Sequence, residues 1–197
     1  LDNINGVNVG LMQFNVDEGG AVSHAVTNIA TARDAVKAAV DRLTPFARTP
    51  LSETLYEATL YFRGAPVDMG NIGPVRSVAA SRRNGDPNGA AYLSPISAEC
   101  QKNFIVLLTD GEPSNDNEAI LKTLDLPGFR TLVGASCDGM GEGHCLDDLA
   151  EYLNKADLDP DSRSGVAALE DLLGVDYPAL AVSALTGEGL ATLGCWL

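Results

Sequence analysis

A short apolar run that ends in Thr-Asp-Gly sets the strongest limit on the fold of this chain. Residues 104–108 read Phe-Ile-Val-Leu-Leu, and polar residues stand on either side of the run. A short run of this kind is typical of a strand that is buried on both faces of a parallel sheet. Asp110 follows, with Gly111 beside it. Open α/β sheets place ligands at the carboxyl ends of such strands, so Asp110 is a candidate site residue. An ordinary Asp-Gly turn after a buried strand would give the same pattern.

The rest of the chain alternates predicted strands with predicted helices. A hairpin is expected over residues 7–26, where apolar alternation surrounds an Asp-Glu-Gly-Gly turn. A buried strand is expected over residues 179–184. Five segments are expected to be helices, namely 31–43, 49–61, 115–124, 145–153 and 166–173, and a last helix is expected to begin over 189–193. This order predicts an α/β fold with a mostly parallel central sheet that is flanked by helices on both faces.

The helix expected after Arg48 begins with the sequence Thr-Pro-Leu-Ser-Glu. Thr49 is suited to the N-cap position and Pro50 to the first helical position. A capping Thr49 would also leave its hydroxyl at a helix N-terminus near the edge of the sheet. A cap without a further role is the simpler interpretation.

Residues 63–103 differ in composition from their surroundings, with many Gly, Pro, Asn, Ser and Arg residues. A stretch of this length inside a domain is usually a surface insertion, partly mobile and sometimes a binding loop. We therefore expect its four arginines to be solvated. They are Arg63, Arg76, Arg82 and Arg83.

Length and charge exclude some classes of function. The 197 residues are enough for one domain with a sizeable core. A formal charge of −14 repels phosphate backbones, which argues against nucleic-acid binding. No apolar run approaches the roughly 20 residues that span a membrane. An acidic surface suits divalent cations, although solubility is the commoner reason for it.

The four cysteines, Cys100, Cys137, Cys145 and Cys195, allow three disulfide connectivities. Cys137 and Cys145 lie on either side of a Gly-rich loop that a disulfide could close, so they are the disulfide candidates. Together with His144 they lack the paired short spacings of zinc modules, which makes a zinc site the weaker alternative. The pattern favours an oxidising compartment.

Four stretches of the chain resemble a von Willebrand factor A (VWA) domain, and more narrowly the VWA domain of the PilY/PilC family of type IV pilus-tip adhesin and biogenesis proteins. The stretches are 7–14, 49–58, 100–113 and 136–150. The Cys-Gln-Lys-Asn and Gly-His-Cys-Leu-Asp-Asp-Leu sequences are more specific for this family than the common Leu-Thr-Asp-Gly.

The likeness covers roughly residues 1–158. It implies a single VWA-like domain with a Rossmann-like sheet, a loop insertion at about 63–103 and a divergent C-terminal segment over 159–197.

The resemblance also implies a metal-ion-dependent adhesion site (MIDAS) with three parts. Thr49 matches the helix-start Thr, and Asp110 matches the Asp after the central strand. Both would be ligands of Mg²⁺, Mn²⁺ or Ca²⁺. The third part, an Asp-x-Ser-x-Ser loop, occurs nowhere in the chain. We therefore expect the chain to be N-terminally truncated, without its first strand, and to bind metal weakly or not at all.

A domain of this kind would be a non-enzymatic adhesion and assembly domain, with minor pilins or host-surface ligands as protein partners. Its expected location is extracytoplasmic, at the bacterial cell surface, the pilus tip or the periplasm. The alternative is a nucleotide-binding or other α/β enzyme domain, because residues 182–190 are similar to the guanine-contacting Ser-Ala loop of small GTPases. In that case Ser183 and Ala184 would contact the base, but the phosphate-binding loop that such proteins need is absent.

Overall fold

The computed structural model describes residues 2–44, 48–98, 101–109, 111–137 and 141–158. Strands β1 (Asn8–Phe14) and β2 (Gly20–Asn28) form the first element, an antiparallel pair. Gly19 makes the turn with a φ of +67°, which glycine adopts without strain. The predicted hairpin is confirmed.

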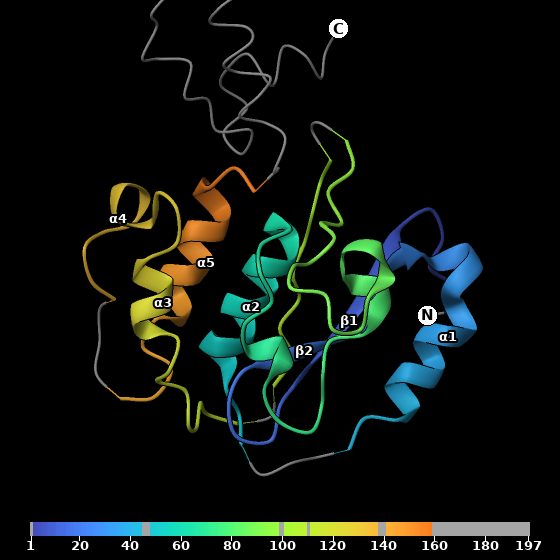
Figure 1. Cartoon of the computed structure of the whole chain (residues 1–197), viewed down its shortest axis with the longest axis horizontal. Coiled ribbons are helices and arrows are strands. Elements are labelled where there is room, and N and C mark those ends of the chain that lie inside the picture. Colours follow the sequence, from blue (N-terminus) through green and yellow to red (C-terminus); the bar gives the residue numbers. More distant parts are fainter. Residues whose placement is uncertain (1, 45–47, 99–100, 110, 138–140, 159–197) are drawn as a thin grey trace, which may run out of the picture.

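Helix α1 (Ile29–Asp41) follows β2 directly and packs against the hairpin (Figure 1). The Asn28 side chain accepts a hydrogen bond from the Ala30 N–H at 2.9 Å, so the helix begins earlier than the predicted residue 31. Its buried residues are Ile29, Ala32, Val36 and Ala39, and the first three pack with Val9 of β1. Val40 and Leu43, which lie within the predicted helix range, are exposed.

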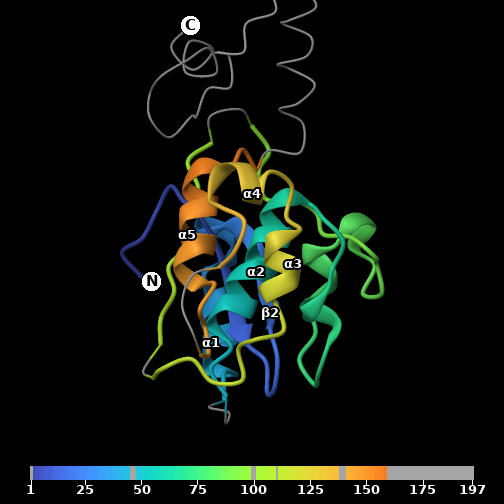
Figure 2. The ribbon, with the colours of Figure 1, turned by 90° about the vertical axis from the view of Figure 1, so that its left-hand side faces the viewer.

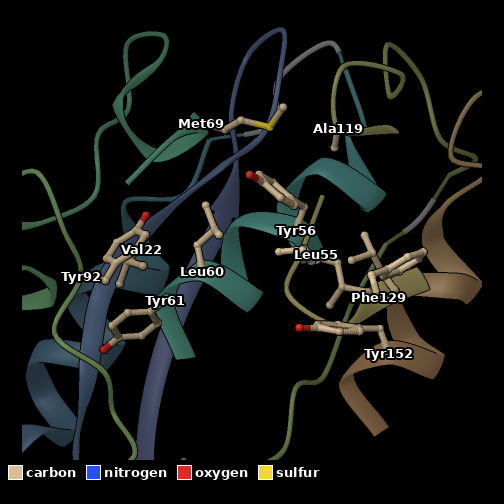
Figure 3. Close-up of a cluster of buried hydrophobic side chains, with 12 residues drawn as sticks. Val22, Leu55, Tyr56, Leu60, Tyr61, Met69, Tyr92, Ala119, Phe129 and Tyr152 are labelled. Carbon is tan, nitrogen blue, oxygen red and sulfur yellow. The ribbon is translucent and has the colours of Figure 1, made fainter. Parts of the chain in front are cut away.

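Helix α2 (Leu51–Arg63) is the centre of the molecule. It lies between the hairpin and a group of three further helices (Figures 1 and 2). Every residue from Leu51 to Tyr61 is buried, although the stretch includes two glutamates. The main hydrophobic cluster surrounds this helix, with aromatic side chains on both of its sides (Figure 3). Gly64, in the left-handed conformation, ends the helix.

The three further helices are α3 (Ile120–Leu124), α4 (Phe129–Leu132) and α5 (Leu146–Lys155). The Phe129 and Tyr152 rings meet at 5.5 Å and join α4 to α5. The helix predicted over 145–153 is confirmed as α5, and its buried residues are Leu149 and Tyr152. Helix α3 begins five residues later than predicted, and α4 lies where the sequence predicts no helix.

The insertion contains three short 3₁₀ turns, η1 (Met69–Asn71), η2 (Ala79–Ser81) and η3 (Arg83–Gly85). The expectation of four solvated arginines is wrong for Arg82, which is only 1% exposed. Its guanidinium donates to the carbonyl oxygens of Ser77 and Gly89 and to the side chain of Asn71. A buried guanidinium must satisfy its donors, and here backbone carbonyls of the insertion do so.

The predicted central strand is not found. Residues 101–109 carry no strand assignment, and Phe104, Val106 and Leu108 are 78–81% exposed. A strand buried on both faces needs strands on either side and helices above and below. In the described part of the chain, β1 and β2 form the only sheet, and it is antiparallel. The fold is therefore mixed α/β, and no parallel sheet is present within the described ranges.

Several predictions lie outside the described residues. They are Asp110, Cys100, Cys195, the helices at 166–173 and 189–193, the strand at 179–184 and the Ser183–Ala184 loop. Among the residues that are described, no helix has both the length and the apolar character needed to cross a membrane.

Candidate functional site

Thr49 lies beside Ser114, immediately before α2. The Thr49 N–H donates to the Ser114 carbonyl at 3.3 Å and to its hydroxyl at 3.0 Å, and the Ser114 N–H donates back to the Thr49 carbonyl at 3.1 Å. This pairing joins the start of α2 to the segment that follows the predicted central run. Thr49 is half-buried, and no hydrogen bond joins its hydroxyl to another described residue.

Asp116, rather than Thr49, satisfies the first amides of α2. Its carboxylate accepts the Ser52 N–H at 2.8 Å, the Ser52 hydroxyl at 2.6 Å and the Glu53 N–H at 3.0 Å. Pro50 occupies the cap position, so the cap predicted for Thr49 is wrong. A carboxylate at a helix N-terminus is also favoured by the helix dipole.

Glu53 joins two distant segments to the first turn of α2. Its carboxylate is fully buried and accepts the Gly19 N–H at 2.6 Å and the Glu118 N–H at 2.8 Å. Burial raises the pKa of this carboxyl to about 7, against the two N–H donors, which favour the charged form. The neighbouring negative charge of Asp116 also raises this pKa.

Glu57 joins the insertion to α2 in the same way, one helical turn further on. Its fully buried carboxylate accepts the Met69 N–H at 2.9 Å, the Asp68 N–H at 3.2 Å and the Tyr92 hydroxyl at 2.6 Å. The Tyr92 hydroxyl also lies 2.8 Å from the Ser77 hydroxyl. Burial raises the pKa of the Glu57 carboxyl despite these donors.

The loop that precedes α5 contacts the same region. The Glu142 carboxylate accepts the Asp116 N–H, and the Gly143 N–H donates to the Asp116 carbonyl at 3.2 Å. Cys137 and Cys145 form the predicted disulfide, with their Cα atoms 5.0 Å apart. The two candidate cysteines are therefore confirmed as a pair.

The described residues contribute oxygen atoms to this site but do not make a metal centre by themselves. The hydroxyls of Thr49 and Ser114 are ligand types that suit Mg²⁺. The carboxylate of Asp116 already accepts three hydrogen bonds from α2. No group of three or more His, Cys, Asp or Glu side chains within the described ranges is placed to hold an ion.

The buried carboxylates are the site residues that the sequence did not predict. Glu53 and Glu57 stand four residues apart, so they share one face of α2. Their spacing on a helix that is otherwise mostly apolar or weakly polar was the available signal. Asp116 stands in an Asn-Asp-Asn sequence at the start of the helix predicted over 115–124, and its role depends on Ser52, which is 64 residues away in the sequence.

Comparison of the chain with protein-family models, with curated proteins and with solved structures gave no match.

Proposed function

We propose that this chain is a non-enzymatic adhesion and assembly domain of the VWA type, related to those of PilY-like type IV pilus proteins. It would bind protein partners through a partial metal-ion-dependent adhesion site formed by Thr49 and Asp110. The partners would be minor pilins or host-surface ligands, and the domain would act outside the cytoplasm. The Cys137–Cys145 disulfide supports an oxidising location.

The observation that carries the proposal is the pairing of Thr49 with Ser114 at the start of α2. Ser114 comes four residues after Asp110, so the chain keeps Asp110 within about 14 Å of it. This limit on distance supports a site that combines Asp110 with the Thr49 hydroxyl. The proposal also implies a mostly parallel sheet, in which residues 104–108 would be a strand once other strands lie beside them.

Thr49 and Asp110 would hold the ion through a hydroxyl and a carboxylate, which are hard oxygen ligands. A divalent ion with few direct carboxylate ligands keeps enough positive charge to attract a carboxylate from a protein partner. The buried tie between Asp116 and α2 would keep the Thr49 backbone in place. Without an Asp-x-Ser-x-Ser loop, the affinity for the ion should be low.

Calorimetric titration with Mg²⁺, Mn²⁺ and GTP tests this proposal. We expect weak binding of the divalent ions, reduced about tenfold or more by Asp110→Ala and by Thr49→Ala, because each removes a direct ligand. Asp34→Ala, which removes an exposed carboxylate from α1, is the matched control and should leave the affinity unchanged.

Two results would contradict the proposal. Tight binding of GTP would favour a nucleotide-binding domain instead. Divalent binding that survives Asp110→Ala would remove the metal site from the proposal.

A further inference from the structure

The disulfide-linked segment before α5 is in direct contact with the residue that caps α2. Glu142 accepts the Asp116 N–H, and Gly143 donates to the Asp116 carbonyl. The Asp116 side chain in turn holds the amides of Ser52 and Glu53. A continuous set of hydrogen bonds therefore runs from the disulfide-linked segment to the first turn of α2.

The contact between Gly143 and its neighbours is close enough to require glycine. Gly143 has a φ of +72°, which side chains other than glycine seldom adopt. A Cβ atom at this position would lie 2.5 Å from the Pro113 Cγ and 3.1 Å from an Asp116 carboxylate oxygen. Asp116 itself is only 2% exposed. The segment is thus packed onto the 113–116 turn as well as hydrogen-bonded to it.

The disulfide connects this segment to the core. Cys145 is buried at the N-terminal end of α5, and the half-buried Cys137 packs against the main hydrophobic cluster. The bond closes a short ring, with a sequence separation of 8. Ring closure limits the positions that Glu142 and Gly143 can take and so lowers the entropy lost when they bind Asp116.

We propose that the Cys137–Cys145 disulfide is a redox-sensitive clamp on the start of α2, acting through Glu142, Gly143 and Asp116. Reduction by a dithiol breaks the S–S bond, and two electrons and two protons convert the sulfur atoms to thiols while the dithiol becomes a disulfide. The freed segment then leaves Asp116, and the first turn of α2 loosens. The clamp does not depend on metal binding, so it stands or falls separately from the proposed adhesive function.

Amide hydrogen exchange followed by NMR on the full chain tests the clamp. The four reporting amides are those of Ser52, Glu53, Asp116 and Gly143. Reduction with dithiothreitol should accelerate their exchange about tenfold or more, while the amides of Val36 and Ala39 in α1 keep their rates. A chain with Cys137→Ser and Cys145→Ser should show the same acceleration without reductant. This variant separates the effect of losing the Cys137–Cys145 bond from any effect of dithiothreitol on Cys100 and Cys195.

Glu142→Ala provides a second test that leaves the disulfide in place. It should accelerate exchange at Asp116, Ser52 and Glu53, with a smaller effect for Glu142→Gln, which keeps an acceptor oxygen. If the clamp acts through Glu142, reduction of the Glu142→Ala chain adds little further acceleration at Asp116. The proposal would be overturned if reduction accelerated exchange at Asp116 as much in the Glu142→Ala chain as in the unaltered chain. It would also be overturned if reduction of the unaltered chain left the four reporting amides unchanged, or accelerated the α1 amides equally.

Discussion

The two glutamates of α2 sit in surroundings that act on their ionisation in opposite directions. Burial favours the protonated form of Glu53, while the N–H groups of Gly19 and Glu118 favour the carboxylate. Burial is the larger effect, because the pKa of Glu53 is raised to about 7 from an ordinary value of 4.5. Glu53 is therefore a group whose charge changes near neutral pH inside the molecule.

This pKa shift predicts how stability depends on pH. Since the folded-state pKa is above the unfolded one, the folded state binds the proton more tightly. The contribution of Glu53 is then fully present below about pH 4.5 and is lost as the pH rises towards 7 and beyond. Glu53→Gln cannot ionise, so its destabilisation relative to the unaltered chain should shrink by about 1–3 kcal/mol between pH 5 and pH 8. Urea unfolding at several pH values measures this, and a destabilisation that stays constant with pH would refute it.

At the scale of elements, the insertion is ordered by polar contacts that converge on α2 and on Arg82. The Glu57 carboxylate accepts hydrogen bonds from the backbone N–H groups of Asp68 and Met69. The Arg82 guanidinium donates to the carbonyl oxygens of Ser77 and Gly89. The segment has little regular secondary structure, so these hydrogen bonds satisfy buried backbone groups that pair with neighbouring strands in a sheet.

Arg82→Met tests the importance of these bonds. The change keeps much of the side-chain volume but leaves several buried carbonyls without donors, which should lower the free energy of unfolding by about 3 kcal/mol or more. Arg76→Met replaces an exposed arginine of the same insertion and should change the free energy of unfolding by less than about 0.5 kcal/mol. Urea unfolding compares the two variants. Equal effects would mean that Arg82 is not the organising residue.

Elements with a local signal could be predicted from the sequence, and those defined by distant contacts could not. The hairpin around Gly19, the three longer helices and the Cys137–Cys145 pair each follow from residues close together in the chain. The cap of α2 does not, because Asp116 reaches it from another segment. The same holds for Arg82, whose partners decide that it is buried. The proposed metal site is predicted from a resemblance, and one of its two residues, Asp110, lies outside the described ranges.

At the scale of the molecule, the described residues combine a layered core with an exposed apolar segment at 104–108. Helix α1, the hairpin, α2 and the group of α3, α4 and α5 follow one another across the molecule (Figure 1). Phe104, Val106 and Leu108 are outside this core and face solvent. An extended apolar segment of this kind promotes association between chains. The net charge of −14 opposes such association at low ionic strength.

Self-association should therefore depend on salt. Raising the ionic strength from about 0.05 M to about 0.5 M screens the repulsion and should increase the weight-average mass in sedimentation velocity runs. Val106→Glu should suppress this increase. Leu121→Glu, which changes an exposed leucine on α3, is the matched control and should leave the salt-dependent increase in mass unchanged. An equal response of both variants would show that added charge alone is responsible.

The two glutamates of α2 also have a consequence for how freely the surrounding loops can vary in sequence. Both carboxylates bind mainly main-chain N–H groups, which every residue except proline carries. At Glu118, whose side chain is exposed, a library of substitutions should yield folded protein with every residue but proline. Gly19 is different, because a Cβ there would lie 2.4 Å from Met69. Outside such crowded positions, the loops around α2 can vary in sequence without losing their attachment to the helix.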